Sequence, residues 1–174
     1  RGPAAGPILT MEPSFVPAAA AIAAAVRHAT GLPITELPAT AEKIFLGLRA
    51  KREAPPAVVV AAGEGKRMGG PKALLRLEGE ALCVRLARAF LDGGCLAVVV
   101  VLGAGADEAE ALLKGLPGVT TVRVPDPSAP MFASVRAGLA AAPGAAERGA
   151  LVHPVDAPRV VASTVWGLLL GLAA

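Results

Sequence analysis

Four short apolar runs divide the chain from residue 57 onward into alternating segments. Each run is rich in β-branched residues and nearly free of polar ones, which is typical of a strand buried on both faces. The stretches between them place apolar residues at helical spacing. Strands alternating with helices predict a mainly parallel sheet with right-handed crossovers, with the third strand at one edge and the first beside the fourth. The predicted strands are Ala57–Ala62, Leu96–Leu102, Val119–Val124 and Ala150–Val155, and the predicted helices are Leu82–Leu91, Ala106–Leu113, Met131–Ala141 and Ser163–Leu170, the last capped by Ser163.

The first 52 residues have a different pattern. An alanine-rich run over Pro17–Thr30 predicts a helix that a glycine ends. Thr40 precedes a second helical start and is a candidate N-cap. The charged stretch Arg49–Glu53, followed by two prolines, predicts a linker. We therefore expect an N-terminal helical tail with its linker over residues 1–52 and an α/β domain over residues 55–174.

Composition and charge exclude several classes of protein. With 174 residues, 54% of them apolar, the chain is long enough for about one well-packed domain. Its net charge of +3 includes no basic block, so no nucleic-acid partner is expected. No apolar stretch reaches the roughly 18 residues of a membrane span. Cys83 and Cys95 are too few for a disulfide framework and have no zinc-ligand spacing. From these features together we expect a cytoplasmic protein.

A glycine-rich loop, residues 63–70, directly follows the first predicted strand. Glycines allow backbone N–H groups to approach and surround an anion. The loop also contains a lysine and an arginine, and Lys72 follows it, so several phosphates could be neutralised here. The spacing Gly63-x-Gly65-x-x-x-Gly69 is one residue longer than the dinucleotide fingerprint, and no Gly-Lys-Ser/Thr sequence marks a P-loop. Because ligands of parallel sheets bind beyond the carboxyl ends of the strands, the loop predicts a phosphate-binding site there.

Three motifs of the chain resemble those of MobA-like nucleotidyltransferases, in the order in which the family has them. They are the run Ala61–Lys72 with the Ala-Leu-Leu after it, the run Met131–Leu139 and the run Pro154–Pro158. The likeness is greatest to the cytidylyltransferases and guanylyltransferases that complete molybdenum cofactor. It implies a three-layer α/β/α, Rossmann-like nucleotidyltransferase domain with a mainly parallel sheet, here incomplete at its C-terminal end, covering about residues 57–174.

The resemblance also implies which residues bind the nucleotide. The backbone of Ala62, Gly63, Gly65 and Gly69 is expected to surround it. Ser134 is expected to lie at the nucleotide pocket, near the base.

Three charged residues are implied to act on the phosphates. Arg67 is expected to bind the β- and γ-phosphates and to stabilise departing pyrophosphate. Lys72 is expected near the α-phosphate, where charge spreads in the transition state. Asp156, at the carboxyl end of the fourth strand, is expected to ligate Mg²⁺, which is usually held by one or two carboxylates plus phosphates. No protein nucleophile is required, because a phosphate oxygen of the acceptor attacks the α-phosphorus.

The expected function is that of a Mg²⁺-dependent enzyme that transfers a nucleoside monophosphate, CMP from CTP, to molybdopterin. GTP is an alternative donor, and a sugar phosphate or another phosphate compound is an alternative acceptor. A different class of function also remains open, in which the chain is a non-catalytic tail or scaffold segment of a molybdenum hydroxylase.

The N-terminal tail resembles another family. The segments 11–22, 29–31, 35–38 and 42–44 look like the C-terminal tail of molybdenum hydroxylase large subunits, to which aldehyde and xanthine dehydrogenases belong. In that family the glutamate before the proline, here Glu12, is the active-site base. Without the cofactor pocket Glu12 has no substrate to deprotonate, so a docking or linker helix is favoured. A molybdenum hydroxylase is therefore a candidate partner.

Several other residues have structural interpretations. Asp126, which lies between two prolines, is interpreted as a turn residue. His153 lies within an apolar strand and is expected to pack rather than to take part in catalysis. The two cysteines are expected to be small core residues.

Overall fold

The chain divides into two compact units, residues 1–48 and residues 49–174, which are described separately. In the computed structural model the described residues are 15–34, 37–63, 65, 70–103, 106–126 and 130–173. Two helices precede the sheet, α1 (Phe15–Thr30) and α2 (Ala41–Arg52). Thr40 Oγ1 accepts a hydrogen bond of 3.3 Å from the N–H of Lys43, which confirms the predicted cap of α2.

The linker predicted over Arg49–Glu53 is wrong for most of its length. Helix α2 continues through Arg52, and Arg49 Nε lies 3.4 Å from Glu53 Oε2. A pair of opposite charges four residues apart stabilises a helical turn, and this pair spans the last turn of α2. The charges that indicated a linker in the sequence are therefore part of the helix end.

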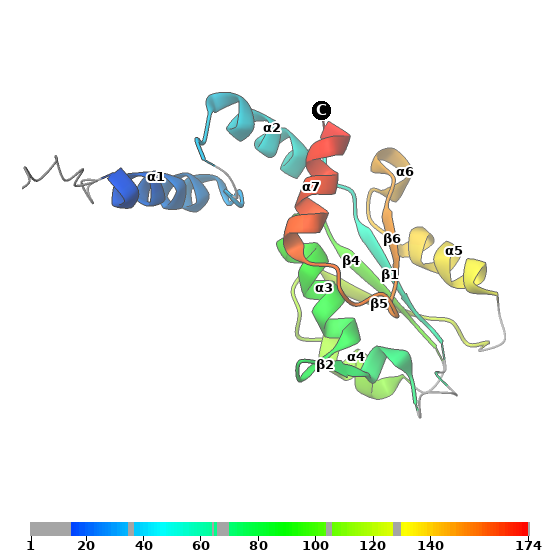
Figure 1. The fold of residues 1–174 in the computed structure, drawn as a ribbon. Helices are drawn as coiled ribbons and strands as arrows, with labels where there is room; N and C mark the ends of the chain where they lie inside the picture. Colours follow the sequence, from blue (N-terminus) through cyan, green and yellow to red (C-terminus); the bar gives the residue numbers. More distant parts are fainter. Residues whose placement is uncertain are drawn as a thin grey trace, which may run out of the picture. The chain divides into compact units, whose positions relative to one another are not determined.

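A four-stranded parallel sheet forms the centre of the second unit (Figure 1). Its strand order is β5-β4-β1-β6, and every neighbouring pair is parallel. The third strand predicted from the sequence lies at an edge and the first lies beside the fourth, so the predicted sheet is confirmed. The strands are β1 (Ala57–Ala61), β4 (Val98–Leu102), β5 (Val119–Arg123) and β6 (Leu151–Pro154).

Helices cover both faces of the sheet and complete the three layers (Figure 1). Helix α5 packs on β1 and β4 from one face, and α3 packs on the same two strands from the other. This arrangement confirms the predicted α/β/α fold. The helices on the α3 side are α3 (Leu82–Asp92), α4 (Asp107–Leu113) and α7 (Ala162–Ala173), and those on the α5 side are α5 (Met131–Ala141) and α6 (Ala145–Arg148).

Alternating valines fill the core on the two faces of the sheet. Val58 and Val101 form a buried cluster on the α5 side, whereas the next residues along each strand face α3. All five residues of β4 are completely buried, as the apolar run predicted. Burying one such side chain contributes about 1.5–3 kcal/mol, so β4 and β1 hold the layers together. These two central strands support the loops at their carboxyl ends.

Some short elements were not predicted. After the glycine-rich loop, a 3-10 turn η2 (Lys72–Leu74) leads into a hairpin of two-residue strands, β2 (Arg76–Leu77) and β3 (Glu80–Ala81). Ser163 is not the cap of α7, because that helix already includes Ala162. Pairs of two residues are too short to show a period in the sequence.

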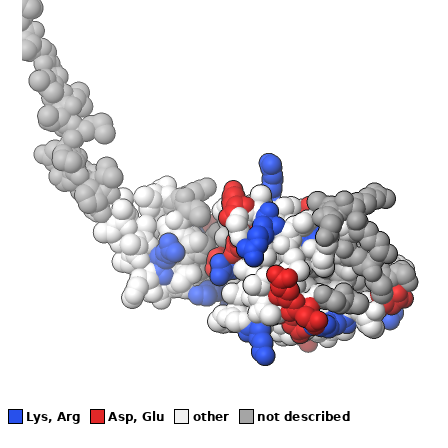
Figure 2. Space-filling model, turned by 90° about the horizontal axis from the view of Figure 1, so that it is seen from below, with Lys and Arg blue, Asp and Glu red and all other residues white. Residues whose placement is uncertain are grey.

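Figure 2 shows the charged side chains on one face of the chain. Acidic and basic side chains are interspersed there among uncharged ones. No helix within the described ranges is long and apolar enough to span a bilayer.

Candidate functional site

A pocket of about 250 Å³ lies where β1 and β6 end side by side. The carboxyl ends of parallel neighbours meet at one edge of the sheet, so the loop after β1 and the turn after β6 both reach this pocket. We call it the strand-end pocket. It is lined by Val60, Ala62, Gly63, Lys72, Asp126, Met131, Ser134, Pro154, Val155 and Asp156.

A tight turn at the end of β6 presents Asp156. The N–H of Ala157 donates to the carbonyl of Pro154 at 3.3 Å, which closes a four-residue turn with Asp156 at its third position. The N–H of Val155 donates to the carbonyl of Val60 at 3.0 Å and ties the turn to β1. Asp156 therefore projects from a fixed backbone, with 55% of its side chain exposed.

Lys72 is the partner of Asp156. This lysine begins η2, two residues after the end of the glycine-rich loop, and its Nζ lies 2.8 Å from Asp156 Oδ2. The hydrogen bond from Lys72 is the main reason why the pKa of Asp156 lies below its ordinary value. The carboxylate is thus negatively charged at neutral pH and already positioned against a cation.

Close backbone approaches shape the glycine-rich loop. Gly65 has φ of +60°, and a Cβ atom there would lie 1.9 Å from the carbonyl oxygen of Gly70. Only glycine permits both the conformation and the approach, so the backbone of Gly65 lies close against that of Gly70. No described atom lies within 4 Å of a Cβ built on Gly63, which faces open space. These are the properties that a phosphate-binding loop requires.

Gly103 was not identified from the sequence. It follows β4, and a Cβ atom there would lie 2.4 Å from the carbonyl oxygen of Ala62. The missing side chain lets the two strand ends approach and places the Ala62 backbone at the pocket. A glycine directly after a buried strand was the available signal.

Two further residues line the pocket, one from α5 and one from the segment after β5. Ser134, in the first turn of α5, is 4% exposed and is a buried polar residue. Asp126 was interpreted from the sequence as a turn residue, but the structure places it in the lining of the strand-end pocket. The position of Asp126 in the sequence could have indicated this, because Asp126 comes shortly after the strand β5, just as Asp156 comes shortly after β6.

The structure brings together most of the predicted site residues that it describes. Ala62, Gly63, Lys72, Ser134 and Asp156 all line the strand-end pocket. Gly65 lies in the adjoining loop and does not line the pocket. The predicted residues Arg67, Gly69 and Glu12 lie outside the described residues.

The donor set fits Mg²⁺. Asp156 and Asp126 bring two carboxylates to one pocket, and the ammonium of Lys72 already lies against one of them. Within the described ranges no three His, Cys, Asp or Glu side chains gather to hold a metal. Mg²⁺ usually takes one or two protein carboxylates and completes its shell with phosphates and water, so a small set is appropriate. Zinc sites usually have three or four protein ligands, most of them His or Cys, so two carboxylates do not fit zinc.

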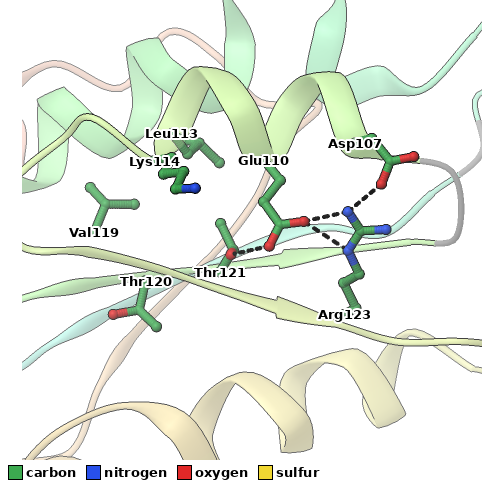
Figure 3. Close-up of a pocket in the computed structure, with 8 residues that line it drawn as sticks. All are labelled: Asp107, Glu110, Leu113, Lys114, Val119, Thr120, Thr121 and Arg123. Atoms are coloured by element: carbon green, nitrogen blue, oxygen red, sulfur yellow. Dashed lines mark hydrogen bonds and ion pairs between the residues drawn. The ribbon is translucent and has the colours of Figure 1, made fainter.

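A larger hollow of about 480 Å³ lies between α4 and the edge strand β5, as Figure 3 shows. Arg123 crosses it, with Nε 2.9 Å from Glu110 Oε2, and it also pairs with Asp107. Thr121 Oγ1 donates to Glu110 at 3.1 Å. These hydrogen bonds, that of Arg123 first, keep the pKa of Glu110 below its ordinary value. Because the charges already neutralise one another, this hollow fastens the end of β5 to α4 and is not the candidate site.

The sequence and the fold together identify the family. The chain belongs to the MobA-like NTP transferase domain family, whose profile matches residues 57–173. This match confirms the resemblance of the three motifs. It begins at the first strand of the sheet, so the likeness of the preceding tail to molybdenum hydroxylases stays a prediction.

Individual relatives differ in their named activities. The chain is 43% identical over 114 residues to the nicotine blue oxidoreductase of Paenarthrobacter nicotinovorans, covering 65% of this chain and 54% of that protein. It is 37% identical over 105 residues to the probable molybdenum cofactor guanylyltransferase of Opitutus terrae, covering 60% of this chain and 49% of that protein. The chain therefore spans about half the length of these two relatives.

Solved structures share the fold. A nucleotidyl transferase from Methanothermobacter thermautotroptrophicus is similar with a TM-score of 0.55 and 32% identity, over 66% of this chain and 56% of that one. Rv0371c from Mycobacterium tuberculosis H37Rv, in a complex with manganese, is similar with a TM-score of 0.53 and 25% identity, over 68% of this chain and 59% of that one.

Proposed function

We propose that the chain forms the nucleotide-binding part of a Mg²⁺-dependent nucleotidyltransferase that transfers CMP from CTP to molybdopterin. The single observation that carries this proposal is the strand-end pocket, in which a glycine-rich loop, Lys72 and Asp156 meet. Family membership supports nucleotidyl transfer. The motifs resemble those of cytidylyltransferases and guanylyltransferases, so CTP is the proposed donor and GTP is the alternative.

The reaction needs alignment and charge neutralisation rather than a protein nucleophile. A phosphate oxygen of the acceptor attacks the α-phosphorus of the nucleotide and forms a new O–P bond. The bond from that phosphorus to the oxygen bridging to the β-phosphate breaks, and pyrophosphate leaves. Positive groups that meet the spreading negative charge lower the barrier of such a step.

Residues in the strand-end pocket and in the adjoining loop have separate roles in this proposal. The backbone around Gly63 and Gly65 binds phosphate oxygens through N–H groups. Lys72 neutralises the α-phosphate, and Arg67 the β- and γ-phosphates. Asp156 would hold Mg²⁺, which would supply positive charge to neutralise the phosphates. The manganese complex of Rv0371c supports a divalent cation in this fold.

The molybdopterin acceptor is supported by one relative and by one likeness. The relative from Opitutus terrae is named as a molybdenum cofactor guanylyltransferase. The resemblance of the tail to molybdenum hydroxylases is consistent with a protein that works on or beside that cofactor. A sugar phosphate or another phosphate compound is the alternative acceptor.

Calorimetric titration tests the proposal. CTP and GTP are titrated into the chain with and without Mg²⁺, using the wild type, Asp156→Asn and the control Asp92→Asn, an exposed carboxylate at the end of α3. We expect Mg²⁺-dependent binding that Asp156→Asn weakens on the order of ten-fold or more and Asp92→Asn leaves unchanged. Pyrophosphate release on addition of molybdopterin then tests transfer. No Mg²⁺-dependent binding of either nucleotide would contradict the proposal.

A second candidate function is that of an oxidoreductase. The relative with 43% identity is named nicotine blue oxidoreductase, and a glycine-rich loop after the first strand can also hold the pyrophosphate of a dinucleotide. NADH and NADPH are therefore added to the titrations. Binding of a dinucleotide without Mg²⁺, and no binding of CTP or GTP, would favour this second function.

A further inference from the structure

His153 lies on the face of β6 that points away from the strand-end pocket. In the pairing with β1 it is opposite Val59, whereas the next residue, Pro154, is opposite Val60 and lines the pocket. The His153 ring packs against Phe90 of α3, with ring centroids 5.5 Å apart and an angle of 59° between the planes. Since Phe90 is only 3% exposed, the imidazole rests on the core.

From this position His153 reaches forward to the turn that bears Asp156. Its Nε2 lies 2.8 Å from the carbonyl oxygen of Ala157. A carbonyl oxygen can only accept, so Nε2 carries the proton and donates it to this hydrogen bond. The N–H of Ala157 is already bonded to the carbonyl of Pro154 at 3.3 Å. Both backbone groups of Ala157, the residue directly after Asp156, are thus held by β6.

We infer that His153 is a positioning residue for Asp156. It fixes the backbone of the turn from behind and so fixes the direction in which the carboxylate enters the pocket. A metal ligand on a fixed backbone loses less conformational entropy on binding, and partners that orient a ligand typically change metal affinity ten-fold or more when removed. This inference rests on the proposed function, in which Asp156 holds Mg²⁺.

Two substitutions separate the hydrogen bond from the packing. His153→Phe keeps a ring against Phe90 but removes the donor. His153→Gln restores an N–H donor at a similar reach. His28→Phe, on α1, is the control for loss of a histidine elsewhere. Each variant is titrated with CTP with and without Mg²⁺, and amide hydrogen exchange is followed at Asp156 and Ala157.

We expect His153→Phe to weaken the Mg²⁺-dependent part of CTP binding on the order of ten-fold and to speed exchange in the turn. Binding of CTP without Mg²⁺ should be unchanged, which a general loss of structure would not produce. His153→Gln should recover most of the Mg²⁺-dependent CTP binding and most of the slow exchange in the turn. His28→Phe should match the wild type in both measurements.

Three results with the His153 variants would overturn the inference. They are wild-type Mg²⁺ dependence in His153→Phe, an equal loss of Mg²⁺-free binding in that variant, and failure of His153→Gln to recover. Asp156→Asn is measured in parallel to separate the two proposals. If Asp156→Asn keeps wild-type Mg²⁺ dependence, the proposed function fails, and the inference fails with it. If Asp156→Asn loses that dependence while His153→Phe retains it, only the positioning role is wrong.

Discussion

Lys72 Nζ donates a hydrogen bond of 2.8 Å to Asp156 Oδ2 across 84 positions of the chain. The two residues come from different elements, η2 and the turn after β6, and meet only because β1 and β6 are neighbours in the sheet. In the proposed reaction they have different partners, the α-phosphate for Lys72 and Mg²⁺ for Asp156. In this proposal Lys72 holds the carboxylate in place before nucleotide and metal enter.

The first prediction concerns the pKa of Asp156. Lys72→Met removes the hydrogen bond that is the main cause of the lowered pKa, so the pKa of Asp156 should rise toward the ordinary value of about 3.9. Because the pKa of Asp156 is lower in the folded chain than in the unfolded chain, the ionised carboxylate stabilises the fold at pH values above the unfolded-state pKa. This contribution to stability is lost as the pH falls through the folded-state pKa. A pH titration of the Asp156 carboxyl carbon by NMR measures the shift, with Lys114→Met as control. An identical pKa in wild type and Lys72→Met would contradict the ion pair.

The second prediction concerns the glycine-rich loop. In Gly65→Ala the new Cβ atom would meet the carbonyl oxygen of Gly70 at 1.9 Å, so the loop must move. Displaced N–H groups no longer match the phosphates, and CTP binding should weaken on the order of ten-fold or more. Gly79→Ala is a matched control, because Gly79 also has positive φ, +85°, but faces open space in the β2–β3 turn. Equal CTP affinity in both variants, measured by calorimetry, would argue against a binding role for this loop.

The sheet was predictable because its strands are buried on both faces. A continuous run of valines, such as β4, is typical of a strand buried on both faces, and the connecting stretches are long enough for helices. The same reasoning placed Asp156 at a strand end and therefore at the ligand-binding edge. Lys72 was found because it lies only two residues after the end of the loop. Each of these residues is marked by a local feature of the sequence, and the parallel topology of the sheet brings the residues together.

Other site residues have no such local signal. Asp126 lies between two prolines, which suits a turn equally well, and only the position of β5 shows that it faces the pocket. Gly103 matters because it approaches Ala62, a contact between two strand ends that no short motif encodes. His153 was expected to pack, and it does pack against Phe90, but its second contact with the Ala157 carbonyl depends on the turn geometry.

The third prediction concerns stability. A Cβ atom at Gly138 would lie 2.3 Å from Val58 Cγ1 and 2.8 Å from Val101 Cγ2, where α5 packs on the sheet. Gly138→Ala should therefore lower the free energy of unfolding by about 1–3 kcal/mol, as overpacking does in close-packed cores. Gly167→Ala, in α7 with nothing within 4 Å, should instead raise it by about 0.4–1 kcal/mol, because alanine favours the helix. Urea unfolding measures both, and equal effects of the same sign would contradict the close packing of α5.

The fourth prediction concerns the two cysteines, both of which are buried. Burial raises the pKa of Cys95 to about 12 and raises that of Cys83 as well. At about pH 8 only about one Cys95 thiol in ten thousand would be a thiolate, which is the reactive form. Ellman's reagent should therefore label neither cysteine in the native chain and both in urea. Cys83→Ser and Cys95→Ser identify which thiol reacts, and rapid labelling of Cys95 in the folded protein would show that the end of α3 opens far more often than its packing implies.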